Sequence, residues 1–387
     1  MRILNYILFF ALISCSKVSH MDLPLSNKII IPKTYVVNKT ESNIIIDGKD
    51  NDWNNSDYTV DFIDIEGDKI PSQKTNTKML WDNDNLYIFA KLYEKHIWGD
   101  ITTRDSTMFL NNDFEVFVTP NDHVNSYGEF EINALGTEWD LFLNKPYRLG
   151  GRADSSWNIE GLKSAVSIDG TINNPNDIDN FWTVEIAIPL NQISLLKDPY
   201  IENDVKAGTV WRINFSRVNW EFDLINDKYF RKKVDGKFLP EYNWVWSPQG
   251  KINMHIPENW GYLVFDDGSL SSDISLGTEL ELEHTLYAIF REIRFGSFKK
   301  LLDLENGSEV KFKAEKFNGK NIYSSFIKND NGFKIFANYG VGVLNYSIDH
   351  RVVSMLLNNF KVVFKFCIFN SFCFKFFNKI YLFFVLN

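Results

Sequence analysis

The chain has 387 residues, of which 44% are hydrophobic and 24% charged, and its formal net charge is −9. This is the composition of a globular protein, and it excludes disordered, collagen-like and multi-spanning membrane chains. The acidic balance, with no cluster of Lys and Arg in the first 270 residues, argues against nucleic acid as a partner, because phosphate contacts dominate that binding.

The N-terminus has the form of an export signal. A basic start is followed by an apolar run, Ile3–Ile13, that is too short to span a membrane. The run Leu12-Ile13-Ser14-Cys15 resembles a bacterial lipobox, in which the Cys is lipidated and becomes the new N-terminus. We therefore predict a lipoprotein signal peptide over residues 1–15, lipidation at Cys15, and a polar tether over residues 16–39. The alternative is a plain secretory signal in which Cys15 is incidental.

Residues 40–267 show short apolar runs with two-residue alternation, interrupted by Asp, Asn, Gly and Pro. Many short strands with regular turn signals predict an antiparallel β-sandwich. Lys78–Trp81 and Leu86–Leu92 flank an Asp-Asn-Asp-Asn turn and predict a hairpin. The other expected strands are Asn43–Ile46, Phe114–Val118, Glu129–Ile132, Trp139–Leu143, Ala165–Ile168, Trp182–Ile188, Trp211–Val218 and Gly261–Phe265.

The chain changes character after residue 267. The spacing of apolar residues predicts one amphipathic helix over Glu279–Arg294. Three short strands, at Glu309–Ala314, Ile322–Ile327 and Phe333–Asn338, then complete a small α+β appendage over residues 276–350. Residues 351–387 form a Phe-rich tail to which we assign no function. The main domain contains no Cys, so a metal site built from Cys is excluded there.

Eight motifs in residues 40–266 carry a resemblance to a known family. They are Ile46-Asp47-Gly48 with Trp53, Met79-Leu80-Trp81-Asp82, Asn112–Val118, Glu129–Asp140, Trp182–Pro189, Trp211–Arg217, Asn243–Gly250 and Pro257–Tyr262. In this order they resemble the family 9-like carbohydrate-binding domains, in a subgroup found in bacterial surface proteins. The resemblance implies a mainly β protein whose sandwich binds a poly- or oligosaccharide beside partner glycoside hydrolases.

The resemblance also indicates where a sugar would bind. Characterised family members hold a terminal sugar between two Trp side chains. Those positions align near Phe109 and Met254 in this chain, and neither residue is Trp. By this alignment, the chain lacks the two Trp side chains of that clamp. Several family members carry structural calcium, and the acidic run Asn174–Asp179 suits calcium, although no EF-hand spacing is present.

Sugar sites combine aromatic rings with planar polar groups. Five Trp residues lie near polar residues and predicted loops, and we take them as candidate sugar platforms: Trp98, Trp139, Trp157, Trp220 and Trp244. The alternative is that a large sandwich fills its core with Trp. We assign Trp81, Trp182, Trp211 and Trp260, which lie in apolar strands, to the core. Trp244 and Trp246 share a strand face opposite Val245, and they face outward or into a cleft if Val245 is buried.

The polar candidates are Glu131, Asn133, Arg148 and Arg217. Glu129, Glu131 and Asn133 share one strand face, while Phe130 and Ile132 point to the core. That polar face contacts a sugar or a cation, or it is simply solvated. Arg148, in a predicted loop, suits a hydroxyl pair or a carboxylated sugar, although a surface role is the plainer alternative.

We therefore expect an exported, membrane-anchored lipoprotein, periplasmic or at the cell surface, whose sandwich binds carbohydrate and supports polysaccharide catabolism. A first alternative is a glycoside hydrolase with Glu131 and Asp140 as its carboxyl pair, although no motif selects that pair. A second alternative is a haem-binding sandwich through Met254 and His255. Adjacent residues on a strand face opposite sides, which argues against both ligating one iron.

Overall fold

The computed structural model describes residues 18–22, 28–54, 56–197, 205–270, 279–317, 319–340, 345–349 and 354–357. The chain divides into two compact units, which we call the first unit (Ile30–Leu276) and the second unit (Met1–Ile29 with Gly277–Asn387). The predicted signal peptide with Cys15, and the tail beyond residue 357 with Cys367 and Cys373, lie outside the described residues. Among the described residues, no helix combines the length and apolar character that crossing a membrane requires.

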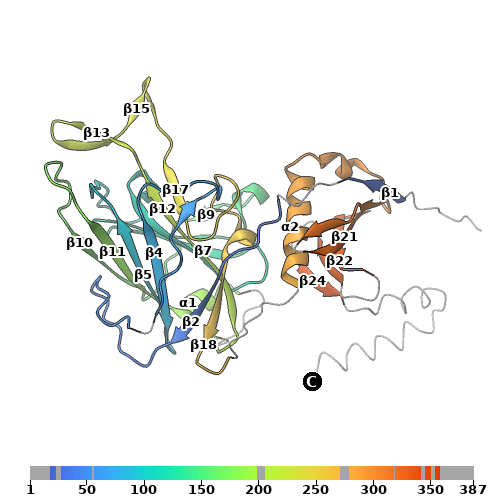
Figure 1. Ribbon diagram of the computed structural model, residues 1–387, viewed down its shortest axis with the longest axis horizontal. Coiled ribbons are helices and arrows are strands. Elements are labelled where there is room, and N and C mark those ends of the chain that lie inside the picture. Colours follow the sequence, from blue (N-terminus) through green and yellow to red (C-terminus); the bar gives the residue numbers. More distant parts are fainter. Residues whose placement is uncertain are drawn as a thin grey trace, which may run out of the picture. The chain divides into compact units, whose positions relative to one another are not determined.

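The first unit is a sheet folded into two facing layers (Figure 1). One layer contains β10 (Lys163–Asp169), β11 (Phe181–Pro189), β5 (Asn85–Tyr93) and β4 (Thr75–Trp81). The other contains β18 (Gly261–Asp266), β12 (Val210–Asn219), β6 (Asp113–Thr119), β7 (Tyr127–Asn133), β8 (Glu138–Leu143) and β9 (Ala153–Asp154). The strand β2 (Thr34–Lys39) joins the layers, because it pairs in parallel with both β18 and β4. The pairs within each layer are antiparallel.

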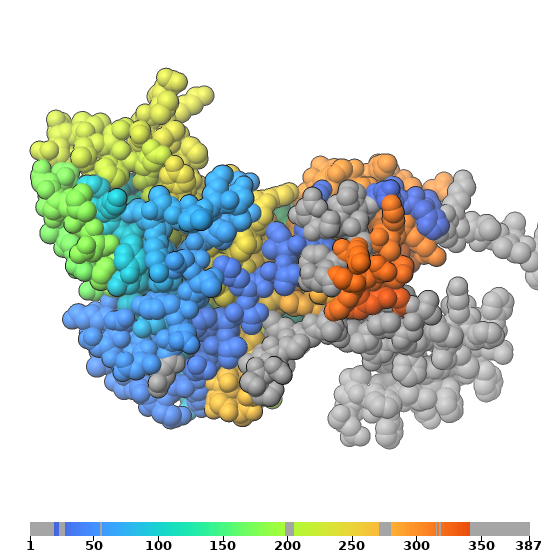
Figure 2. All heavy atoms as spheres, in the orientation of Figure 1, coloured from blue at the N-terminus to red at the C-terminus, as the bar shows by residue number. Residues whose placement is uncertain are grey.

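Shorter elements complete this unit. The strand β17 (Tyr242–Val245) pairs with β12 and with β3 (Ile63–Asp64). Two small hairpins project from one end of the sandwich (Figure 1, Figure 2), and they are β13 (Phe222–Ile225) with β14 (Lys228–Arg231) and β15 (Lys233–Val234) with β16 (Lys237–Phe238). The short helices are α1 (Leu190–Ser194) and the 3₁₀ turns η1 (Met108–Leu110), η2 (Tyr147–Leu149) and η3 (Pro257–Asn259).

The main apolar core lies between the two layers. Every second residue of a strand contributes to it, for example Ile88 and Val184 from one layer and Phe130 and Ile213 from the other. Trp81, Trp182 and Trp211 lie in this core as expected, and Trp260 packs in a smaller cluster with Phe117 and Tyr127. The predicted antiparallel β-sandwich is confirmed.

The predicted hairpin at residues 78–92 is also confirmed, and its turn shows why it forms there. Asp82 Oδ1 accepts hydrogen bonds from the backbone N–H groups of Asp84 (2.8 Å) and Asn85 (2.7 Å). The Tyr87 hydroxyl donates to Asp82 Oδ2 at 2.7 Å. The aspartate therefore holds the chain reversal between β4 and β5, as Asx turns do.

Two expectations were wrong. The segment predicted as a polar tether, residues 16–39, contains the strands β1 (Val18–Met21) and β2. Asn43–Ile46, expected as a strand, is irregular because its groups bond and pack locally. The backbone N–H of Ile45 donates to Asp52 Oδ2 at 2.7 Å, and Ile44 packs in a small cluster with Trp53.

The second unit combines one long helix with a sheet, as predicted for the appendage. The helix α2 covers Glu279–Arg294, and its apolar side includes Leu286, Ile289 and Phe290, all buried. Phe290 lies 6.1 Å from Phe333, ring centre to ring centre. The other elements are η4 (Lys299–Asp303), β19 (Glu309–Phe312), β20 (Glu315–Phe317), β21 (Lys320–Asn329), β22 (Gly332–Asn338), β23 (Asn345–Asp349) and β24 (Ser354–Leu357), with β1 parallel to β19.

A buried ion pair links the two layers of the sandwich. Arg217 of β12 lies 3.2 Å from Glu94, which directly follows β5, and the two side chains are 0% and 3% exposed. The guanidinium also donates to the carbonyl oxygen of Tyr93 (2.8 Å), and the indole of Trp182 donates to Glu94 (2.7 Å). Removal of one partner from such a pair leaves the other as an uncompensated buried charge. This typically lowers the free energy of unfolding by about 3–5 kcal/mol.

We predict that Glu94→Gln lowers the free energy of unfolding by about 3 kcal/mol, because Arg217 keeps its buried charge. The double variant Glu94→Gln/Arg217→Met should recover part of this loss. Urea unfolding of these two variants and of the single variant Arg217→Met measures the coupling. The control is Glu221→Gln/Lys232→Met, an exposed ion pair whose removal should change the free energy by less than about 1 kcal/mol. Strictly additive losses at positions 94 and 217 would contradict the coupling.

Candidate functional site

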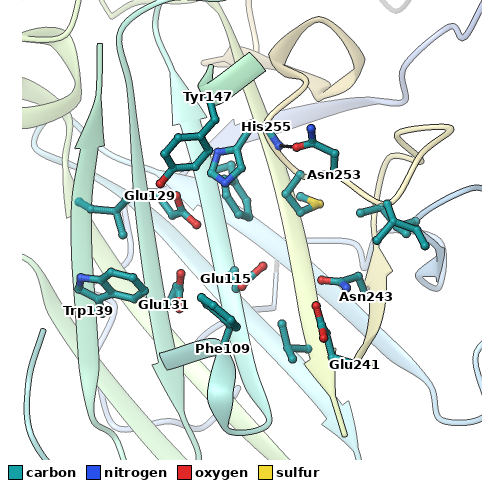
Figure 3. A pocket seen from close by; sticks show the side chains of 16 residues that line it. Phe109, Glu115, Glu129, Glu131, Trp139, Tyr147, Glu241, Asn243, Asn253 and His255 are labelled. Atoms are coloured by element: carbon teal, nitrogen blue, oxygen red, sulfur yellow. Dashed lines mark hydrogen bonds between the residues drawn. The ribbon is translucent and has the colours of Figure 1, made fainter. Parts of the chain in front are cut away.

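A cavity of about 290 Å³ lies on the outer face of the layer that contains β12, β6, β7 and β8 (Figure 3). Strand alternation places it there. Phe114 and Val116 of β6 point into the core, so Glu115 and Phe117 point outward. The lining residues are Ile65, Phe109, Glu115, Phe117, Glu129, Glu131, Trp139, Leu141, Tyr147, Val218, Glu241, Asn243, Ile252, Asn253, Met254 and His255.

The strand register builds the floor of the cavity. Glu131 of β7 lies between its two registered partners, Glu115 of β6 and Trp139 of β8. Glu129 is aligned in the same way with Phe117 and Leu141. The floor therefore combines carboxyl groups with apolar side chains. This arises because β7 carries Glu at two successive outward positions, Glu129 and Glu131.

Aromatic and polar walls flank this floor. Phe109 of η1 is 39% exposed, and Figure 3 shows its ring at the same end of the cavity as Trp139. Glu241 and Asn243 lie across the cavity from Trp139. An apolar ring surface opposite carboxyl and amide groups suits a ligand that has both C–H faces and hydroxyl groups.

His255 is fixed at the other end of the cavity by aromatic neighbours. Its Nδ1 shares a hydrogen bond of 3.0 Å with the Tyr127 hydroxyl. Its ring lies 4.5 Å from that of Tyr147 and 5.8 Å from that of Phe117, centre to centre. Burial lowers the pKa of His255 to about 4. The imidazole is therefore neutral at physiological pH.

The carboxyl groups of the floor are buried to an unusual degree. The exposed fractions are 5% for Glu115, 5% for Glu129 and 2% for Glu131, and 0% for Asp113, which lies beside them on β6 without lining the cavity. Burial is the largest cause that raises the pKa of each group, and it raises that of Glu115 to about 7. Repulsion from Glu115 raises the pKa of the other three further. Binding of a group that neutralises these carboxylates is therefore favourable at the floor.

The structure brings four of the predicted site residues into this cavity. They are Phe109, Glu131, Trp139 and Met254. Phe109 and Met254 are separated by 145 positions in the chain, and the fold brings both to this cavity. The predicted faces of β7 are also confirmed, because Phe130 and Ile132 lie in the core while Glu129 and Glu131 line the cavity.

Arg217 and Trp244 do not line the cavity. Arg217 lies inside the sandwich, and the Trp244 ring lies 5.1 Å from its guanidinium. Trp244 and Trp246 do share a face, as predicted, but both rings face the main core, while Val245 packs beneath the cavity with Phe117 and Leu141. The prediction of outward rings was wrong because both faces of β17 are covered.

Asn133 and Trp157 have structural positions as well. Asn133 accepts hydrogen bonds from the backbone N–H groups of Leu135 and Thr137, both at 3.0 Å, and braces the turn after β7. Trp157 packs against the main core. A Cβ atom at Gly128 would lie 2.9 Å from the Trp157 ring, so this glycine makes room for it. Neither residue lines the cavity.

Trp98 and Trp220 pack in a separate cluster with Val218 and Tyr229. Trp98 lines a second cavity, of about 510 Å³, near the hairpins β13–β16. The Trp220 indole donates to the carbonyl oxygen of Phe109 at 2.8 Å. Trp220 therefore positions η1, whose Phe109 lines the first cavity.

Arg148 lies next to the cavity without lining it. Its guanidinium is bound to the buried carboxylate of Glu258 at 2.5 Å. The preceding residue, Tyr147, does line the cavity. The expected loop is the short turn η2, and the ion pair holds Tyr147 at the rim.

The carboxyl pair proposed for the hydrolase alternative does not share a cleft. Asp140 is the registered partner of Phe130, so it points to the opposite face of the layer from Glu131. There it pairs with Arg104 and accepts a hydrogen bond of 2.6 Å from the backbone N–H of Ile159. The pairing of Glu131 with Asp140 was therefore wrong.

Met254 and His255 both line the cavity, contrary to the expectation that they face opposite sides. That expectation assumed a strand, whereas these residues lie in an irregular segment before η3. The haem alternative stays a prediction. So does calcium at Asn174–Asp179, where Asp179 accepts hydrogen bonds from the backbone N–H groups of Ile97 (2.8 Å) and Thr171 (2.7 Å).

Several cavity residues were missed from the sequence. Glu115 could have been found by applying to Phe114–Val118 the alternation already used for β7. Tyr147 and Glu241 lie in loops, where no periodicity shows which way a side chain points. His255 was considered only as a haem ligand.

No family model matches the chain, and no curated protein matches it. Several solved structures are similar to it, and they include the following three. A protein of Bacteroides uniformis, provisionally assigned as carbohydrate-binding, is 16% identical, covers 60% of this chain and 99% of its own, and has a TM-score of 0.43.

The other two are family 9 carbohydrate-binding modules from Caldicellulosiruptor kristjanssonii. The complex with cellotriose is 16% identical, with 63% of this chain and 98% of its own covered and a TM-score of 0.39. The complex with glucose is 15% identical, with 62% and 100% covered and a TM-score of 0.39. This is the family that the sequence motifs resemble.

The buried, neutral state of His255 gives a prediction for stability. Its pKa is 6.5 when unfolded and about 4 when folded, so the unfolded chain binds the extra proton between these values. The free energy of unfolding therefore has its full contribution from neutral His255 above pH 6.5. This contribution falls by about 3 kcal/mol in all as the pH falls towards 4 and below.

We predict that His255→Gln removes this pH dependence. The difference in unfolding free energy between wild type and variant should shrink from pH 8 to pH 4, as measured by urea titration at each pH. The value at pH 8 gives the packing cost alone. A difference that stays constant over this range would contradict a buried neutral imidazole.

Proposed function

We propose that the cavity binds a saccharide, and that it takes the end of a glycan chain. The observation that carries this proposal is the meeting of Phe109 and Met254 in one cavity, beside Trp139 and a carboxyl-rich floor. Aromatic rings stack on the C–H faces of sugars, and carboxyl and amide groups bond their hydroxyls. The cavity volume, about 290 Å³, is at the lower end for small-molecule sites and suits one end of a chain.

The similar solved structures offer probes for this proposal, because the Caldicellulosiruptor modules were solved with cellotriose and with glucose. We propose a ligand of the same broad class. The clamp positions hold Phe and Met in place of Trp, so the preferred sugar need not be the same. A panel of polysaccharides is therefore the right first screen, with cellotriose and glucose included.

We also propose that the protein is exported and anchored by a lipid on Cys15, periplasmic or at the cell surface. The lipobox-like run Leu12-Ile13-Ser14-Cys15, after a short apolar segment, supports this. A saccharide-binding domain held at a membrane would keep glycan close to partner hydrolases. The partner hydrolases are inferred from the setting in which such carbohydrate-binding domains usually occur.

We predict that Trp139→Ala and Phe109→Ala each weaken saccharide binding about tenfold or more, which corresponds to about 1.4 kcal/mol. Each removes a ring surface from the cavity, and neither residue belongs to the main core between the layers. Affinity electrophoresis followed by calorimetry measures the loss. The control is Tyr323→Ala, an exposed aromatic residue on β21 of the second unit. If no polysaccharide retards the wild-type protein, the proposal fails.

We predict that Cys15→Ser abolishes lipid attachment. The wild-type protein, expressed in a bacterial host and labelled with a radioactive fatty acid, should carry label and sediment with membranes. The variant should carry none. Cys373→Ser is the matched control and should keep the label. Equal labelling of wild type and Cys15→Ser would contradict lipid attachment at Cys15.

A further inference from the structure

Three carboxylates at the cavity floor and directly beside it lie close together. One oxygen from each of Asp113, Glu115 and Glu131 lies within 4.8 Å of the other two. Asp113 and Glu115 are two residues apart on β6, and Glu131 is the registered partner of Glu115 on β7. The strand pairing therefore holds the three groups together.

The hydrogen bonding of these groups is incomplete. Neither oxygen of Asp113 makes a hydrogen bond of standard geometry, although the side chain is completely buried. The same holds for one oxygen each of Glu131 and Glu129. Within the described residues, no Lys or Arg forms an ion pair with any of these carboxylates. A buried acceptor without a partner has a high free-energy cost.

The remaining buried carboxylates of the first unit provide the comparison. Glu94 is bound by Arg217 and Trp182, and Glu258 by Arg148. Glu185 accepts from the Trp53 indole and from two backbone N–H groups, at 2.8 Å each. Asp140 and Asp179 also have backbone donors. In the described part of the unit, the carboxylates without such partners gather at the cavity floor.

Ser216 adds a neutral oxygen to the same place. It is the registered partner of Glu115 on β12, its side chain is fully buried, and its hydroxyl makes no hydrogen bond of standard geometry. Ser216, Glu115 and Glu131 thus form a row of oxygen-bearing side chains across three strands. These side chains offer only oxygen atoms as metal ligands, and hard cations such as Ca²⁺, Mg²⁺ and Mn²⁺ prefer oxygen ligands.

We propose that Asp113, Glu115 and Glu131 hold a divalent cation of this oxygen-binding kind at the floor of the cavity. A cation neutralises carboxylates that no other group in the described chain neutralises. It also lies next to buried carboxylates, Asp113 and Glu131, that have oxygens without a hydrogen bond of standard geometry. Calcium takes 6–8 oxygen ligands, so coordination positions are left for water or for a ligand in the cavity.

The proposal stands apart from saccharide binding, because the cation site is complete in the protein without a sugar. Should the proposed function hold, sugar hydroxyls are oxygen ligands of the right type for the open positions. The two proposals are therefore tested by different measurements, and either can fail alone.

The test uses the full chain, stripped with EDTA and dialysed at pH 7. Titration with Ca²⁺, Mn²⁺ and Mg²⁺ in separate runs, with no sugar present, should raise the midpoint of thermal unfolding with at least one of them. Calorimetry should give one site per chain, and EDTA should reverse the shift. Asp113→Asn and Glu131→Gln should each weaken cation binding at least tenfold.

These variants keep the size of the side chain and remove a buried charge, so they should fold. The matched control is Glu66→Gln/Asp68→Asn, in the exposed acidic group Asp64, Glu66 and Asp68. That control should respond to the cation as the wild type does. Loss of the response in the control, but not in Asp113→Asn or Glu131→Gln, would overturn the assignment. A wild-type protein that responds to none of the three ions would also overturn the assignment. In that case protons alone would neutralise the cluster.

Discussion

The alternation of side chains along β6 and β7 is the constraint on which the rest of the first unit depends. Phe114, Val116, Phe130 and Ile132 face the core, and this forces Glu115, Glu129 and Glu131 to face outward together. A shift of one residue in the register would bury all three carboxylates between the layers. The apolar core therefore fixes the geometry of the cavity as strictly as it fixes the fold, and the floor is rigid because it is part of the sheet.

The sandwich uses buried carboxylates in two ways. Glu94 and Glu185 are surrounded by donors, and each ties distant segments together: Glu94 joins β5 to Arg217 on β12, and Glu185 holds the backbone around Asp47 and Gly48. The carboxylates of the cavity floor are buried as deeply, but they lack such donors. Groups kept in an unfavourable state within a well-satisfied framework are characteristic of binding sites. The contrast arises within one sheet, so it does not reflect a generally poor pairing of the fold.

Local patterns in the sequence predicted the elements that depend on local physics. The hairpin at Asp82, the helix Glu279–Arg294 and the two faces of β7 all follow from turn chemistry or periodicity. Arg217 and Trp244 were misplaced because the partner that draws Arg217 inward, Glu94, is more than a hundred positions away. No periodicity distinguishes a buried arginine with a distant partner from one that faces a ligand. Tyr147 and His255 were missed as cavity residues for a related reason, since loop side chains are oriented by contacts that form only in the fold.

On the proposed function, Phe109 and Met254 would take the places of two Trp side chains, and this would change which forces are available to a ligand. Phe109 offers a smaller ring than Trp, and Met254 offers a flexible thioether in place of a flat surface. Trp139 supplies a large ring from β8, but this ring lies beside the carboxyl floor and does not face Phe109 across the cavity. On the proposed function, stacking would then act mainly at one end of the cavity, and more of the selectivity would come from the polar floor and from Glu241 and Asn243 across it. Since oriented polar groups discriminate between hydroxyl arrangements more strongly than ring surfaces do, such a site would be narrower in its choice of sugar than a two-ring clamp.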